Sequence, residues 1–144
     1  MSFLGPFDAA AMLMRLQAHV SVCKVFGLAT DLEAAIKNPP AALPAGYLVI
    51  SERAADSSGL TGLLMQDVSV QVEVVWMVRN HSPAAALADM RAVIEQGRSA
   101  LLGWHAPDTD APMTAMTKQD IQYSGGVLIS SDVFRTSYTI QRTV

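Results

Sequence analysis

Apolar and polar residues alternate through the segment from Gln66 to Asn80, which predicts a long β-strand. Because successive side chains of an extended chain point to opposite faces, one face carries five valines and Trp76. The opposite face begins polar and ends apolar, with Ser69, Gln71, Glu73, Val75 and Met77. We expect the valine face to pack against helices, and the polar positions of the other face to look outward.

Two segments in the first 40 residues have helical signals. Apolar residues follow helical spacing from Phe7 to Val20, so we expect an amphipathic helix there. The run Thr30 to Glu33 matches a capping box, which predicts that a second, short helix begins there. This helix must end by Asn38, because Pro39 and Pro40 remove backbone donors and disfavour helical geometry.

A third and longer helix is predicted after the valine strand. Ser82 suits the N-cap position, Pro83 suits the first helical position, and Gly103 suits a left-handed cap after the last turn. Residues at helical spacing predict its buried stripe: Leu87, Met90, Ile94, Gly97 and Leu101. We expect this helix and the first one to cover the valine face.

Further strands are separated by loops rich in turn-forming residues. The loops are expected at Arg53 to Gly62 and His105 to Pro112, and the strands at 47–52, 118–123, 127–129 and 133–142. Short connections between neighbouring strands favour antiparallel pairing. The predicted fold class is α+β, with a mostly antiparallel β-sheet of about four strands and helices packed on one face, in a single domain of residues 1–144.

The amino-acid composition indicates that the protein has a protein partner. The chain is 51% hydrophobic and 16% charged, with a mean hydropathy of +0.28, so we expect another subunit to cover part of its surface. A formal charge of -3 argues against tight binding of nucleic acid. Cys23 stands alone, so no intrachain disulfide is expected. The N-terminal segment has no basic leader and includes polar residues, so we expect neither a signal peptide nor a membrane span.

Sequence signals for catalysis, cofactors and metals are lacking. The three histidines are scattered, and the aspartates at 108, 110 and 120 do not have the ligand spacing of a calcium loop. Neither a phosphate-binding glycine loop nor a serine-nucleophile elbow occurs. We expect no enzyme activity, no cofactor and no metal. Trp76 is expected in the core, while Trp104 either anchors the loop that follows it or lies in a subunit contact.

Several local strings, taken in order, resemble those of one family. These strings are the run Ala100-Leu101-Leu102-Gly103-Trp104 before Pro107 and an acidic loop, the strand end Val78-Arg79-Asn80, the upstream run 47–50, and the C-terminal strand 134–142. Their order and spacing, from about Val20 onward, resemble the tail terminator proteins of tailed bacteriophages. The strings are packing motifs, and the stretch before Phe7 has no counterpart in this pattern.

This resemblance implies a structural protein of the virion. Such a subunit is expected to form a ring, most simply a hexamer, on the head-proximal end of the phage tail tube. The ring stops tube polymerisation and provides the docking surface for the head connector. The implied partners are further copies of the chain, the tail tube protein and the head-tail connector or head-completion protein. DNA passes through the pore without specific binding, and assembly takes place in the host cytoplasm.

The resemblance and the polarity of the loops together give a set of candidate interface residues. They are Arg53, Asp56, Gln66, Glu73, Arg79, Trp104, Asp108 and Asp110. We expect Glu73 and acidic loop residues to face the pore or the tube end. The loops Arg53 to Leu63 and His105 to Met116 are expected to contact the tube and the connector, unless they are ordinary solvated loops.

Two other functions fit the same sequence. A head-closure or neck protein of the head-tail junction would have a similar size and would also form a ring. A ferredoxin-like module that binds a small ligand would show a similar alternation of helices and antiparallel strands.

Overall fold

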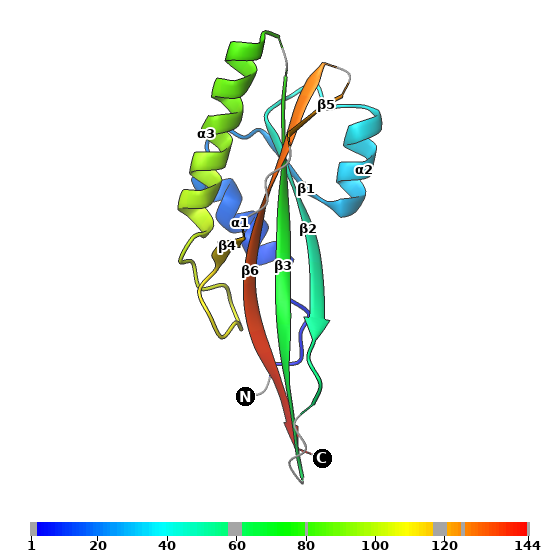
Figure 1. Ribbon diagram of the computed structural model, residues 1–144, viewed down its shortest axis with the longest axis vertical. Coiled ribbons are helices and arrows are strands. Elements are labelled where there is room, and N and C mark those ends of the chain that lie inside the picture. Colours follow the sequence, from blue (N-terminus) through cyan, green and yellow to red (C-terminus); the bar gives the residue numbers. More distant parts are fainter. Residues whose placement is uncertain (1–2, 58–61, 80, 117–120, 125, 144) are drawn as a thin grey trace.

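The computed structural model describes residues 3–57, 62–79, 81–116, 121–124 and 126–143. Within these ranges the chain forms three helices and one mixed sheet of six strands (Figure 1). The elements are α1 (Ala9–His19), β1 (Val25–Leu28), α2 (Ala29–Lys37), β2 (Ala45–Ala54), β3 (Leu63–Arg79), α3 (Pro83–Leu101), β4 (Thr114–Met116), β5 (Ile121–Ser124) and β6 (Val127–Thr143).

The sheet is mostly antiparallel, which confirms the α+β class. Its strands follow the order β1-β2-β3-β6-β4, β5 also pairs with β6, and β1 pairs with β2 in parallel. The expected number of strands, about four, was too low, because the short strands β1 and β4 have little pattern of their own. The predicted strands 127–129 and 133–142 are one strand, since the polar residues between them pair opposite Val74, Val75 and Trp76 of β3.

The two longest strands, β3 and β6, pair along their whole length, from Leu63 opposite Thr143 to Arg79 opposite Val127. One end of this pair extends beyond the helices and gives the molecule its narrow end (Figure 1). We call this end the blade and define it as residues 51–54 of β2, 63–70 of β3 and 137–143 of β6. The blade is therefore a three-stranded projection from a helix-covered body.

The valine face of β3 packs under α1 and α3, as predicted. Its side chains, from Val68 to Val78, are between 0% and 3% exposed and share one core with residues of both helices. Trp76 lies between two glycines: a Cβ atom at Gly46 or at Gly97 would be 2.6 Å from its ring. Gly97 therefore belongs to the buried stripe because it lets α3 approach the indole closely.

The helices lie on both faces of the sheet, which corrects the prediction of one covered face. A second core joins Tyr47, Val75 and Met77 of the opposite face to Ala35 and Leu32 of α2. Figure 1 shows α2 on one side of the sheet and α1 and α3 on the other. The physical reason is visible in β3, whose outward face turns apolar at Val75 and Met77 and must be covered there.

The predicted caps and stripe of α3 are mostly correct. The Ser82 hydroxyl accepts a hydrogen bond from the N–H of Ala85, and Gly103 has a φ of +77°, as its left-handed role requires. Leu87 is wrong as a core residue, because it is 51% exposed and Ala86 is buried beside it. Among the described residues, no helix combines the length and the apolar character that a membrane crossing needs.

Candidate assembly interface

Three candidate residues lie on or beside the blade. Arg53 and Asp56 are exposed at the end of β2, and the Gln66 side-chain amide donates to the Ala55 carbonyl oxygen at 2.9 Å. The backbone N–H of Ala55 donates to the Asp67 carbonyl oxygen, so the hairpin is paired up to this point. The predicted loop 53–62 is thus partly strand, and its residues 58–61 lie outside the described ranges.

The proline loop after α3 lies along the outer edge of β6. The backbone N–H of Asp110 donates to the Ser137 carbonyl oxygen at 2.8 Å, and the Thr136 hydroxyl donates to the Ala111 carbonyl oxygen at 2.8 Å. Asp108 is exposed with a φ of 59°, a left-handed conformation that aspartate tolerates. These hydrogen bonds fix the loop on the sheet, so Asp108 and Asp110 occupy defined positions on the molecular surface.

Two carboxylates approach one hydroxyl where this loop meets the blade. Thr139 Oγ1 lies 2.6 Å from Asp110 Oδ2 and 2.9 Å from Asp67 Oδ1. A hydroxyl has one proton, so it donates to one of the two carboxylates at a time. The contact therefore joins the loop to the blade while leaving negative charge at the surface.

Trp104 anchors the start of the same loop. Its backbone N–H donates to the Leu101 carbonyl oxygen, and its carbonyl oxygen accepts from the N–H of Met113 at 2.9 Å. The Arg15 guanidinium lies 5.8 Å from the indole ring centroid, a cation–π contact that ties the loop to α1. Trp104 therefore anchors the loop. Its ring is half-buried and part of it is accessible, so a subunit contact at Trp104 stays a prediction.

Glu73 and Arg79 lie away from the other candidates. Glu73 is half-buried in the middle of β3, and the Arg79 guanidinium donates to the Ala41 carbonyl oxygen at 3.1 Å at the far end of that strand. Gln66 and Arg79 are separated by roughly 40 Å along β3, at about 3.3 Å per residue. The eight candidates are therefore spread along an elongated surface and do not converge on one pocket.

The segment before α1 is a part of the structure that the sequence left unexplained. Phe7 is 5% exposed, and its backbone N–H donates to Glu52 Oε1 at 3.2 Å. The Phe3 ring packs edge-on against Tyr138 with 5.2 Å between centroids, and Gly5, with a φ of +80°, lies against the same tyrosine. This segment packs over the base of the blade, and the two phenylalanines around Gly5-Pro6 were the available signal.

Tyr138 gives the blade a testable dependence on pH. Burial and a hydrogen bond to Glu52 raise the pKa of Tyr138 from 10.0 to about 12. The folded state therefore holds this proton more tightly than the unfolded chain, so the contribution of Tyr138 to stability should be constant below about pH 10 and should be lost between about pH 10 and about pH 12. Urea titrations of the wild type and Tyr138→Phe across this range should show a shallower decline in the variant. Equal slopes would contradict the assignment, while a remaining slope is expected in both proteins because burial also raises the pKa of Cys23, to about 11, and that of Tyr47.

An ion pair that the sequence did not reveal joins α3 to the sheet. Arg98 Nε and Nη2 donate to the two carboxylate oxygens of Asp132 at 2.7 and 3.2 Å. The Asp132 side chain is 3% exposed, and the hydrogen bond to it raises the pKa of Arg98. The signal was the acidic residue among the buried positions of β6, on the face that α3 covers.

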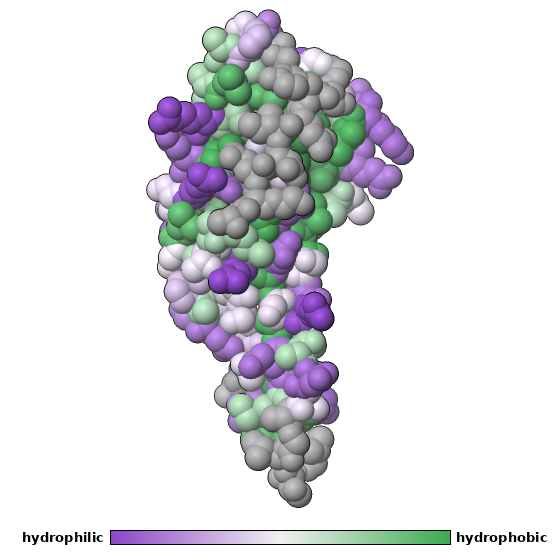
Figure 2. Space-filling model, in the orientation of Figure 1, coloured by the Kyte–Doolittle hydropathy of each residue, from purple (hydrophilic) through white to green (hydrophobic). Residues whose placement is uncertain are grey.

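Large apolar side chains remain exposed on both sides of the molecule. On α2 and just before it these are Leu28 and Ile36, and on the α1 and α3 side they are Met14, Leu87 and Leu102. Their exposed fractions run from 40% for Leu28 to 69% for Met14. Figure 2 shows hydrophobic residues at the surface on both flanks of the wide half of the molecule. This agrees with the expectation that another subunit covers part of the surface.

The described residues include candidate metal ligands and a single thiol, that of Cys23. Among them, no group of three or more His, Cys, Asp or Glu side chains is placed to hold a metal ion. Burial raises the pKa of the Cys23 thiol to about 11, so this group is protonated and a poor nucleophile near neutral pH.

Fold and surface together define the class: an elongated α+β assembly subunit with a projecting sheet and uncovered apolar flanks. The sequence model of the family described as "Phage tail terminator protein" matches residues 2–144, so the chain belongs to this family and is a structural protein of the phage tail. No curated protein matches the chain. A chain in the solved structure "Virion of native gene transfer agent (GTA) particle" is similar, with a TM-score of 0.50 and 18% identity over 94% of this chain and 96% of that chain. This likeness confirms the fold.

Proposed function

We propose that copies of this chain form a closed ring, most simply a hexamer, on the head-proximal end of the tail tube. The ring blocks further addition of tube subunits and provides the surface on which the head connector docks. Membership of the tail terminator family supports this function over that of a small-ligand module. The observation that carries the proposal is the presence of two different apolar flanks on one subunit.

The position of these flanks favours a head-to-tail contact. Leu28 and Ile36 belong to the α2 side, while Met14 and Leu102 belong to the side of α1 and α3. Figure 1 shows α2 and α3 on opposite sides of the sheet. An interface in which the α2 flank of each copy contacts a different surface of its neighbour repeats around an axis and closes by rotation.

The remaining exposed polar surface suits the two ends and the channel of such a ring. We assign Asp56 on the blade and Asp108 on the proline loop to contacts with the tube or the connector. Glu73 lies on the sheet face that begins polar, and we assign it to the channel. A net charge of -3 is compatible with DNA sliding past, because a strongly basic channel would hold the duplex through counterion release.

Purified tail tubes that lack the protein provide the test. Added protein should appear as a ring at one end of each tube by electron microscopy, and soluble tube protein should then no longer lengthen that end. Ile36→Asp should weaken ring formation, because it places a charge on an apolar flank, whereas Thr30→Asp on the exposed start of the same helix should not. Continued tube growth with bound protein would contradict termination. Binding to isolated connectors but not to tubes would favour the head-closure alternative.

A further inference from the structure

We infer that α2 of one copy docks in a groove over β3, β6 and β4 of the next copy, with Glu33 against Arg135 and Ile36 against Met116 and Pro112. This inference rests on the proposed ring and names the two surfaces that close it. It requires that the lining of the groove and the outer face of α2 match in charge and apolar character, and that the two surfaces lie far apart on one subunit.

The groove has a volume of about 510 Å³ and lies over β6, between residues of β3 on one side and of β4 with the preceding loop on the other. Its walls combine one cation with apolar and small polar groups: Ser69, Val70, Gln71, Ala111, Pro112, Thr114, Met116, Arg135, Thr136 and Ser137. Arg135 is exposed, and the ion pairs formed among the described residues do not include it. The groove therefore suits a surface that brings one carboxylate and one apolar side chain close together.

The outer face of α2 has this combination. Glu33 and Ile36 are three residues apart in the helix, a spacing that places them next to each other on one face. Ile36 is 47% exposed, although it is one of the larger apolar side chains of the protein. Glu33 contacts Lys37 at 3.8 Å, but both side chains are 78% exposed, and such a surface pair is weak enough to exchange for another cation.

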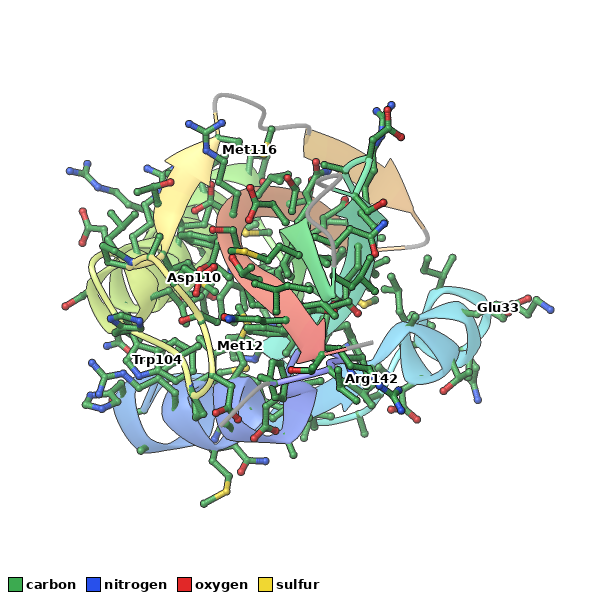
Figure 3. The ribbon with its side chains drawn as sticks, turned by 90° about the horizontal axis from the view of Figure 1, so that it is seen from below. Met12, Glu33, Trp104, Asp110, Met116 and Arg142 are labelled. Atoms are coloured by element: carbon green, nitrogen blue, oxygen red, sulfur yellow. The ribbon has the colours of Figure 1, made fainter. Side chains whose placement is uncertain are left out.

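The two surfaces lie far apart on one subunit, as a head-to-tail ring requires. Figure 3 shows Glu33 on the outer side of α2 and Met116 well away from it, on β4, which lies at the opposite edge of the sheet from β1. A copy therefore cannot bring its own α2 into its own groove. The groove has a positive charge, the α2 face has a negative charge, and both have exposed apolar surface. One chain therefore carries both of the surfaces that a contact with a second copy needs.

Charge reversal on each side, and on both sides together, tests the pairing. Arg135→Glu and Glu33→Arg should each raise the protein concentration needed for half-maximal ring formation, with and without tail tubes, by about tenfold or more. The double variant Arg135→Glu/Glu33→Arg should return to within about threefold of the wild type, because the pair is restored with reversed charges. Sedimentation velocity and counting of rings on tube ends provide the two measurements.

Arg142→Glu is the matched control. Arg142 lies on the same strand as Arg135 and has the opposite side-chain direction, because the two positions differ by an odd number of residues. This variant should form rings like the wild type. Far-ultraviolet circular dichroism and the thermal midpoint show whether each variant is folded.

The outcomes separate this inference from the function on which it rests. If the wild type forms rings and the single variants form them equally well, the pairing is wrong and the ring stands. A double variant as defective as the single variants also overturns the pairing. If Arg135→Glu loses tube binding but still forms rings, the groove binds the tube subunit and the inference falls. If the wild type neither forms rings nor binds tubes, both proposals fail.

Discussion

Val72→Asp should prevent the domain from folding. Val72 is 0% exposed on β3, between Ile50 of β2 and Phe134 of β6, beneath α1 and α3. The change removes about 1.5–3 kcal/mol of apolar burial and adds the desolvation of an unpaired carboxylate, about several kcal/mol more. Together these costs consume most of the roughly 5–15 kcal/mol that stabilises a typical domain. Circular dichroism and urea titration of the purified variant measure the effect.

Gln71→Asp is the control for this prediction. Gln71 is the neighbour of Val72 on the same strand, but its side chain is exposed on the opposite face. Its replacement should change the free energy of unfolding by only about 0.5 kcal/mol, as is usual for surface positions. A Val72→Asp variant that unfolds cooperatively at the wild-type urea concentration would contradict the assignment of the valine face to the core.

The contrast between these neighbouring residues explains why β3 could be predicted from the sequence. A period of two assigns each side chain to a face without knowledge of the rest of the chain. The same pattern showed that the second face turns apolar at Val75 and Met77. It could not show which element covers these two residues, because α2 and α1 both present a single apolar stripe, and their side of the sheet depends on chain connections.

The errors on β6 and α3 have a common cause. Ser130, Ser131 and Asp132 interrupt the apolar pattern of β6, so local reasoning divides the strand. The strand continues because β3 pairs with it throughout and Arg98, from a distant part of the sequence, binds Asp132. Leu87 fits the stripe of α3 by spacing, yet it lies near the beginning of the helix, where it is exposed. Both outcomes depend on tertiary contacts that no local window contains.

The sequence predicted that part of the surface is covered by a partner, but it did not predict where the interface residues lie. Hydrophobic content indicated that a partner covers some surface, and the structure locates the exposed apolar residues on two flanks. The polar candidates were chosen as loop residues, whereas Asp110 is fixed on β6 through Ser137 and Thr139. Sequence spacing gives no measure of these cross-strand contacts. It also could not show the groove at Arg135, because this surface forms only when β3, β6 and β4 pair.

Arg98→Met should destabilise the protein by about 3 kcal/mol, because it leaves the Asp132 carboxylate buried without its cation. The Arg98 side chain is 43% exposed, which places the expected cost at the lower end for a buried pair. For a chain of this length such a loss corresponds to a decrease of about 10 °C in the thermal midpoint. Differential scanning calorimetry and urea titration measure the two quantities.

Two further variants show whether the loss of stability comes from the unpaired Asp132 carboxylate. Arg98→Met/Asp132→Asn should be more stable than Arg98→Met alone, because the amide removes the buried charge that the first change leaves unpaired. Arg91→Met breaks the exposed pair with Glu95 on the same helix, whose side chains are 81% and 66% exposed, and should cost about 0.5 kcal/mol or less. If Arg98→Met and Arg91→Met have equal effects, the contact with Asp132 contributes no more than a surface pair. The attachment of α3 to the sheet would then depend on the apolar packing of its buried face, which includes Met90, Val93 and Leu101.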